Sequence, residues 1–142
     1  PLYVCLLGLA GHASNRVYVQ WMEIGRTKLL GEAGLPVHLL GERGVLPILA
    51  GTEIEYRKPL RLGDRVRVEV WLSGLGAASA GIELRFFDSG GNLAATGSHR
   101  AAFIDAGSRR PLRLSPEMRA AFEPFLEAPL SRRRSKTGGA PR

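Results

Sequence analysis

The sequence predicts an α+β domain in which one long helix is covered by an antiparallel sheet. The helix is indicated by residues 11–34, where apolar side chains recur at helical spacing. The sheet is indicated by several later segments in which apolar and charged residues alternate. With 142 residues, 44% of them hydrophobic, the chain is long enough for one domain with its own core, which we expect over residues 1–130.

The chain opens with an apolar run at residues 2–7, which favours a strand covered on both faces. A glycine-rich loop follows, and then the helix, which we expect at about residues 14–33. Ser14 or Asn15 can cap it, because a short oxygen-bearing side chain accepts hydrogen bonds from the N–H groups of the first turn. Gly34 supplies the C-terminal stop.

The predicted helix has a broad apolar face and a narrow polar stripe. The breadth of the apolar face favours a helix that is mostly buried. The apolar positions are Val17, Tyr18, Trp21, Met22, Ile24, Gly25, Leu29, Leu30 and Ala33, and the stripe consists of Arg16, Gln20, Glu23 and Thr27. Glu23 and Arg26 are three residues apart, so they could simply pair as neighbours on the helix.

The segment after Gly34 contains two glycines and a proline, so it is predicted to be a connecting loop with one helical turn. A strand follows at residues 45–59, in which Ile54 and Tyr56 alternate with charged residues. The next strand has the clearest pattern, because Val66, Val68 and Val70 alternate with Arg65, Arg67 and Glu69.

A loop rich in Gly, Ala and Ser is predicted at residues 73–81, and a further strand around residues 82–86. Residues 89–92 (SGGN) predict a tight hairpin into a strand over about 93–104. Ser115 followed by Pro116 is typical of a helix start, and this short helix should extend to about Leu126.

The formal net charge is +7, but residues 131–142 hold five of the twenty basic residues and none of the thirteen acidic ones. The rest of the chain therefore has fifteen basic against thirteen acidic residues, a net charge of +2. We expect the basic tail, residues 131–142, to be disordered. It has no aromatic residue on which a base could stack, so we expect no specific nucleic-acid binding.

Cys5 is the only cysteine, so no internal disulfide can form, and a cytoplasmic location is the expectation. No apolar run approaches the roughly 20 residues that a membrane helix needs, so no membrane partner is expected. The three histidines, His12, His38 and His99, show no metal-ligand spacing, and neither a metal nor another cofactor is expected.

Two motifs point to a known family. Residues 11–15 (GHASN) resemble the Gly-His-Val-Asn-Asn loop, and residues 56–64 (YRKPLRLGD) the Tyr-x-x-Pro-Leu-x-x-Gly-Asp turn, of the hot-dog fold acyl-CoA thioesterases of the 4-hydroxybenzoyl-CoA thioesterase type. The resemblance covers about residues 2–127. It implies a hot-dog fold, hydrolysis of an acyl-CoA to a free acid and CoA, and a homodimer or homotetramer whose sheets join edge to edge, with active sites between subunits.

Thioester hydrolysis requires a base or nucleophile at the carbonyl carbon and donors for the developing oxyanion. The resemblance implies that a backbone amide at Asn15, at the positive end of the helix dipole, supplies the oxyanion site. His12 and the side chain of Asn15 could add hydrogen bonds. The alternative is that both residues only stabilise the turn and cap the helix.

The sequence departs from the family at the catalytic acid. The usual position, three residues before the loop glycine, is Gly8, and a second common position is Leu6. No Asp or Glu precedes Glu23. Three accounts remain open: Glu23 acts as the base, the protein is a non-catalytic acyl-thioester binder, or its first ten residues differ from those of a functional parent.

Basic residues near the predicted strand ends could contact the phosphates of coenzyme A as charge-assisted hydrogen bonds. The alternative is that they are plain surface charges. These residues are Lys58, Arg100, Arg109, Arg110 and Arg113.

Overall fold

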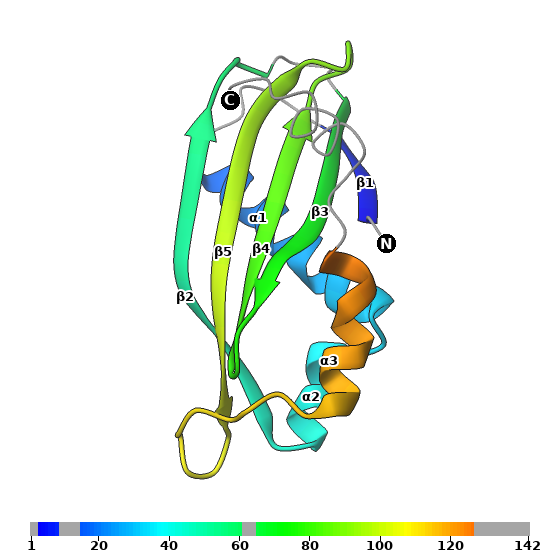
Figure 1. The fold of residues 1–142 in the computed structure, drawn as a ribbon. Helices are drawn as coiled ribbons and strands as arrows, with labels where there is room; N and C mark the ends of the chain where they lie inside the picture. Colours follow the sequence, from blue (N-terminus) through cyan, green and yellow to red (C-terminus); the bar gives the residue numbers. More distant parts are fainter. Residues whose placement is uncertain (1–2, 9–14, 61–64, 127–142) are drawn as a thin grey trace, which may run out of the picture.

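The structure, a computed structural model, describes residues 3–8, 15–60 and 65–126, and for residues 3–8, 15 and 16 it describes the backbone alone. His12 and the tail at residues 131–142 lie outside the described residues. The fold is α+β, as predicted: one antiparallel sheet with a long helix packed against it (Figure 1).

Five strands form the sheet in the order β1-β3-β4-β5-β2, and every neighbouring pair is antiparallel. Their bounds are Tyr3–Gly8 for β1, Val45–Tyr56 for β2, Arg65–Leu75 for β3, Ser79–Phe87 for β4 and Leu93–Asp105 for β5. The helices are α1 (Asn15–Glu32), α2 (Val37–Glu42) and α3 (Pro116–Phe122), and α3 runs on into a 3-10 turn, η1 (Glu123–Leu126). Each predicted strand and helix is therefore present.

The C-terminus of α1 shows why the chain turns there. Gly34 has a φ of 80°, a left-handed conformation that costs a glycine little. The N–H of Gly34 donates to the carbonyl of Gly31, and the N–H of Leu35 donates to that of Leu30. These two bonds are the Schellman pattern, and the buried side chains of Leu30 and Leu35 accompany it.

The helix α1 buries only one of its sides. Tyr18, Met22 and Leu29 are at most 2% exposed and pack into the core beneath the sheet. The prediction of a mostly buried helix was wrong for the other side, where Val19 and Ile24 are 36% and 37% exposed. A single sheet can cover only one side of a helix, so this apolar surface remains open in one protomer.

Strand β2 is an edge strand with a bulge. Its register against β5 shifts between Leu49 and Gly51, so one extra residue lies on the β2 side. In the pairing, Leu49 lies opposite Ala101 and Thr52 opposite His99. Odd-numbered residues before the bulge and even-numbered residues after it therefore share the face that α1 covers.

Strands β3 and β4 are longer than predicted. The loop expected at residues 73–81 is mostly strand, because β3 continues to Leu75 and β4 begins at Ser79. Gly74 pairs with Gly81 after a register shift. Small residues at this point lowered the strand signal in the sequence, but they still form backbone hydrogen bonds.

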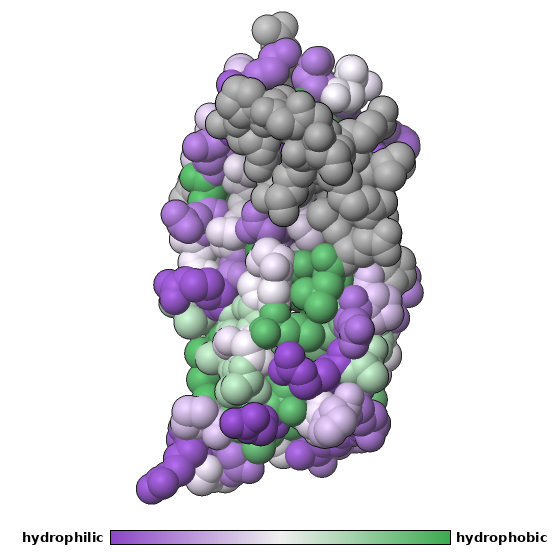
Figure 2. All heavy atoms as spheres, in the orientation of Figure 1, coloured by the Kyte–Doolittle hydropathy of each residue, from purple (hydrophilic) through white to green (hydrophobic). Residues whose placement is uncertain are grey.

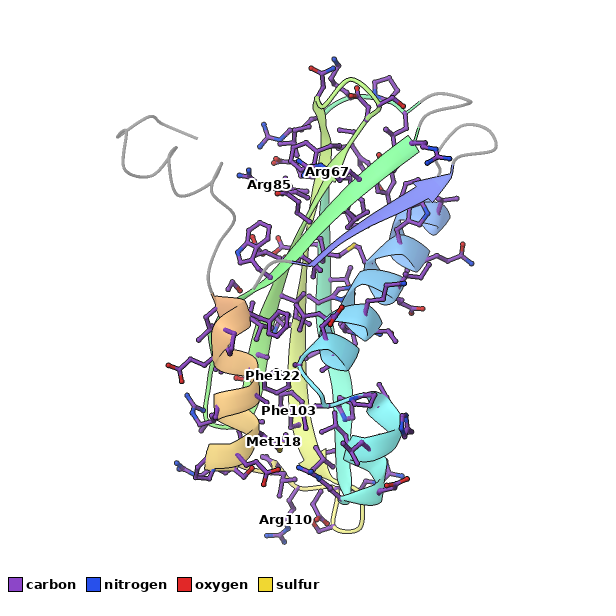
Figure 3. The ribbon with its side chains drawn as sticks, turned by 90° about the vertical axis from the view of Figure 1, so that its right-hand side faces the viewer. Arg67, Arg85, Phe103, Arg110, Met118 and Phe122 are labelled. Carbon is purple, nitrogen blue, oxygen red and sulfur yellow. The ribbon has the colours of Figure 1, made fainter. Side chains whose placement is uncertain are left out.

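On the outer face of the sheet, away from α1, hydrophilic residues surround a group of hydrophobic ones in the described part (Figure 2). Arg67 and Arg85 lie on this face (Figure 3). The Arg67 guanidinium lies 4.7 Å from the centre of the Phe87 ring and donates to Glu69 at 2.8 Å. The alternation predicted an exposed Glu69, but its side chain is only 6% exposed because the long neighbouring side chains cover it.

The start of α3 agrees with the prediction. Oγ of Ser115 accepts a hydrogen bond from the N–H of Met118 at 3.1 Å, and Pro116 occupies the first turn. Met118 and Phe122 point from α3 towards Phe103 of β5 (Figure 3), and the rings of Phe103 and Phe122 are 6.1 Å apart. This short helix therefore closes one end of the core.

No helix in the described ranges has the length and apolar character needed to cross a membrane.

Candidate active site

The start of α1 is the centre of the candidate site. The helix begins at Asn15, the residue predicted for the oxyanion site. The first turn of any α-helix has N–H groups without intrahelical acceptors, and the helix dipole adds positive potential there. This position is compatible with the oxyanion role that the family resemblance implies for Asn15, and that role stays a prediction.

Aromatic side chains surround the first two turns of α1. The Tyr18 ring contacts those of Trp21, Tyr56 and Phe86 edge-on, with ring centres 5.1–5.3 Å apart. Tyr56 comes from the end of β2 and is 50% exposed. Strand β2 thus lies beside the start of α1 through the Tyr18–Tyr56 contact.

Tyr18 is not a base at neutral pH. Burial, with a further contribution from Tyr56, raises the pKa of Tyr18 to about 12. Its hydroxyl therefore stays protonated, and the ring serves as an apolar wall.

Glu23 lies away from the start of α1. It is exposed, and it shares the solvent side of the helix with Gln20, Ile24, Thr27 and Lys28. At a rise of about 1.5 Å per residue, Glu23 is about 12 Å along the helix axis from Asn15. One protomer therefore does not bring these two predicted site residues together.

Four other carboxylates are directed away from α1. Glu53 and Glu55 alternate with the inward-facing Ile54 on β2, and Glu69 and Glu83 alternate with inward-facing residues on β3 and β4. Because strand side chains alternate between faces, these carboxylates lie on the outer face. They do not reach the start of α1.

The core contains a polar pair that the sequence does not signal. Nη1 of Arg26 lies 3.0 Å from Nδ1 of His99, which is 1% exposed and comes from β5. A guanidinium only donates, so Nδ1 is the acceptor and the proton of this neutral imidazole is on Nε2. Arg26 lies on the same helix as Glu23, and its hydrogen bond to His99 connects that helix to the sheet. No short-range spacing signals a contact between residues 73 positions apart.

An apolar cavity of about 180 Å³ lies below this pair, between α1, α2, α3 and the sheet. Arg26 lines it together with apolar side chains that include Leu30, Ala80 and Phe122. Val37, Ile48 and Leu49 also line it and are 38–48% exposed. The cavity therefore opens to the surface between α2 and β2.

The basic residues predicted to bind CoA do not gather at one place. Lys58 follows the end of β2 beside Tyr56, whereas Arg109 and Arg110 follow β5 at the opposite end of the sheet (Figures 1 and 3). The length of β2 separates these ends by about 35 Å. One phosphate cannot contact both groups within a protomer.

Arg100 and Arg113 occupy two further positions. Arg100 is in the middle of β5, and its guanidinium lies directly over Gly51 of β2, so that a side chain at position 51 would collide with it. Arg113 is exposed between β5 and α3. In the described part of the chain, no group of three or more His, Cys, Asp or Glu side chains is placed to hold a metal ion.

A five-stranded antiparallel sheet covering one long helix, with the helix start beside the end of β2, is the hot-dog fold. Residues 8–122 match the thioesterase-like superfamily. This match covers most of the chain, and the chain therefore belongs to that superfamily.

Three individual comparisons agree with this assignment. The chain is 29% identical over 122 residues to the Bacillus subtilis (strain 168) protein named "Putative acyl-CoA thioesterase YneP", covering 82% of this chain and 85% of that one. A thioesterase from Thermus thermophilus, solved with coenzyme A and Zn, is 25% identical with a TM-score of 0.72, covering 89% and 95% of the two chains. The DHNA-CoA thioesterase of Staphylococcus aureus shares the fold, with a TM-score of 0.78, 17% identity and coverage of 99% and 97%.

Proposed function

We propose that the protein is an acyl-CoA thioesterase that hydrolyses an acyl-CoA to a free acid and CoA. The observation that carries the proposal is the superfamily match over residues 8–122, which includes the GHASN motif at residues 11–15 and the start of α1. The name of the Bacillus relative and the coenzyme A in the Thermus structure support an acyl-CoA as the substrate.

In the proposed reaction, a water oxygen forms a bond to the thioester carbon, the C–S bond breaks, and the CoA sulfur leaves and acquires a proton. The carbonyl oxygen becomes an oxyanion in the transition state. The backbone N–H groups at Asn15 and its neighbour stabilise it, with His12 as an additional donor.

The active form is a dimer that joins through β2. The outer edge of β2 pairs with no other strand in the described part of the chain, and Ile48, Leu49 and Tyr56 along it are 38–50% exposed. Unpaired edges of this kind favour pairing with another strand. A second copy would also cover the exposed Val19 and Ile24 of α1.

Two-fold symmetry makes this dimer antiparallel at β2. With the axis near the middle of the strand, Ile48 of one copy lies across from the Ile54–Tyr56 end of the other. That end is beside the start of α1, through the Tyr18–Tyr56 contact. The mouth of the cavity in one copy therefore adjoins the helix start of the second copy.

Glu23 is the proposed general base. Within one protomer it is about 12 Å from Asn15 along the helix, so it acts on the substrate held at the helix start of the second copy. Lys58 is the proposed contact for CoA phosphate near the site, because it follows the same end of β2 as Tyr56. Arg100, Arg109 and Arg110 remain further candidates for that role.

A thiol-release assay over a panel of aromatic and aliphatic acyl-CoAs tests the proposal. The chain is compared with Glu23→Gln, with Gly8→Asp, and with Glu32→Gln as a control for an exposed carboxylate on the same helix. We expect Glu23→Gln to lower kcat by about 100-fold or more, within the range of general-base catalysis, and Glu32→Gln to leave it unchanged.

Two results would contradict the proposal in different ways. Activity that appears only in Gly8→Asp would identify the natural chain as an acyl-thioester binder without its catalytic acid. Absence of acyl-CoA binding by calorimetry in all of these proteins would remove the thioesterase assignment itself. A monomer at micromolar concentration in sedimentation would contradict the dimer.

A further inference from the structure

The cavity beneath α1 has one charged residue, Arg26, and one hydroxyl residue, Thr27, in a lining that is otherwise apolar. Its walls come mainly from Leu, Ile, Ala, Val and Phe side chains, and Arg26 and Thr27 line it from the helix. The one hydrogen bond that the structure gives this guanidinium within the described residues goes to the neutral imidazole of His99. No described carboxylate forms an ion pair with it.

This combination selects for a particular kind of ligand. A guanidinium has five N–H donors in a planar fork, and the contact with Nδ1 of His99 uses only one Nη atom. The fork matches a carboxylate, and an apolar, partly water-excluded environment strengthens the attraction between opposite charges. The best complement to the cavity is therefore an apolar body that carries one carboxylate.

The size of the cavity limits that body. Its volume is about 180 Å³, and an engineered apolar cavity of about 150 Å³ holds benzene. An aromatic ring or a chain of about six carbons therefore fits. The partly exposed lining residues Val37, Ile48 and Leu49 mark the entrance of the cavity, which lies on the β2 side. The dimer proposed above places the helix start of the second copy at this entrance.

We propose that this cavity receives the far end of the acyl group, and that Arg26 makes the enzyme selective for acyl-CoAs whose acyl group ends in a carboxylate. The inference rests on the proposed thioesterase function. Its substrate is a short dicarboxylic acyl group, held by its thioester at the helix start of one copy and by its free carboxylate at Arg26 of the other. His99 is a positioning residue, because its Nδ1 fixes the guanidinium at the cavity wall.

The first test measures kcat/KM for hexanoyl-CoA and adipoyl-CoA, which differ at the far end of the chain. The wild-type protein should prefer adipoyl-CoA by tenfold or more. Arg26→Met keeps much of the apolar stem but removes the charge, and it should abolish the preference by lowering adipoyl-CoA hydrolysis while sparing hexanoyl-CoA. His99→Leu should weaken the preference, and His99→Asn, which retains an acceptor near the Nδ1 position, should restore part of it.

The second test measures binding without catalysis, by NMR titration of the full chain with hexanoate and with 1-hexanol as the uncharged control. Wild type should bind hexanoate at least tenfold more tightly than hexanol, and Arg26→Met should bind both equally. Ala80→Leu fills the cavity from its lining and should lose both ligands. If Arg26→Met is unfolded by circular dichroism, Arg26→Gln and Ala80→Leu provide the same comparison.

The two proposals can fail separately. Hydrolysis of hexanoyl-CoA and adipoyl-CoA at equal rates would overturn the carboxylate selectivity while leaving the thioesterase assignment intact. Hexanoate binding that depends on Arg26, in a protein that hydrolyses no acyl-CoA, would support the carboxylate site and contradict the enzyme. Hexanoate binding that is unchanged in both Arg26→Met and Ala80→Leu would overturn the inference.

Discussion

Met22 of α1 lies directly over Gly97 of β5. A Cβ atom built on Gly97 would be 2.7 Å from Cε and 2.9 Å from Sδ of Met22, closer than real Cβ contacts. Met22 is fully buried, so its side chain has little room to move aside. The absence of a side chain at position 97 therefore sets how closely the helix approaches the sheet.

We expect Gly97→Ala to lower the free energy of unfolding by about 1–3 kcal/mol, since it overpacks this contact. Urea denaturation measures the change. Gly74→Ala is the matched control, because a Cβ at that strand position meets nothing within 4 Å. Combining Gly97→Ala with Met22→Ala should cost less than the sum of the single changes, because the smaller helix residue makes space. Full additivity would contradict the contact.

His99 makes stability depend on pH. Burial, followed by the charge of Arg26, lowers the pKa of His99 from 6.5 to about 4. Between these values the unfolded chain binds a proton that the folded chain does not, so stability falls as the pH is lowered through this window. Between about pH 7 and pH 4.5 this group should remove about 2–3 kcal/mol.

The measurement is urea denaturation at both pH values for wild type and His99→Asn. The carboxylates titrate in both proteins and cancel in the comparison, so the decrease should be smaller in His99→Asn by about the amount above. Equal decreases would mean that His99 is not buried in its neutral form.

The N-cap of α3 should contribute to stability. Ser115→Ala removes the acceptor for the N–H of Met118 and should lower the free energy of unfolding by about 0.5–2 kcal/mol. Ser115→Asp keeps an acceptor at this position and should retain most of the stability that the cap contributes. Chemical denaturation compares the two variants. If Ser115→Asp is as destabilised as Ser115→Ala, the side-chain cap is not the cause.

Removing positive charge at the two ends of the sheet should have unequal effects. Lys58 is beside Tyr56, so Lys58→Ala should raise KM for acyl-CoA severalfold with little change in kcat, the pattern of a uniform binding contact. Arg110→Ala, at the opposite end, is the control and should leave KM unchanged. The reverse result would place the CoA phosphates at the loop that follows β5.

Much of the fold was predictable because its signals are local. The glycine that ends α1, the Ser-Pro start of α3 and the glycines of the hairpin after β4 each follow from the conformation of a few residues. The exposure of Ile24 and the burial of Glu69 were not predictable in this way. Both depend on which surfaces the sheet covers, and this is decided by elements far away in the sequence.

The candidate site was only partly predictable for the same reason. The structure confirms that α1 begins at Asn15, whereas the role of Asn15 in the oxyanion site stays a prediction. The contact between Arg26 and His99 joins α1 to β5, and the cavity takes its lining from all three helices and four strands. The pattern of residues within a single segment cannot predict contacts between segments that are far apart in the sequence.

The bulge in β2 affects which strands can join this edge of the sheet. Because the strand changes phase between Leu49 and Gly51, a straight, regular strand from an unrelated protein cannot pair with its full length. Another copy of the same strand carries the same bulge, and in the proposed dimer a two-fold axis would relate the two bulges. We therefore expect the extra residue to discourage pairing of this edge with unrelated strands, while the proposed pairing with a second copy stays possible.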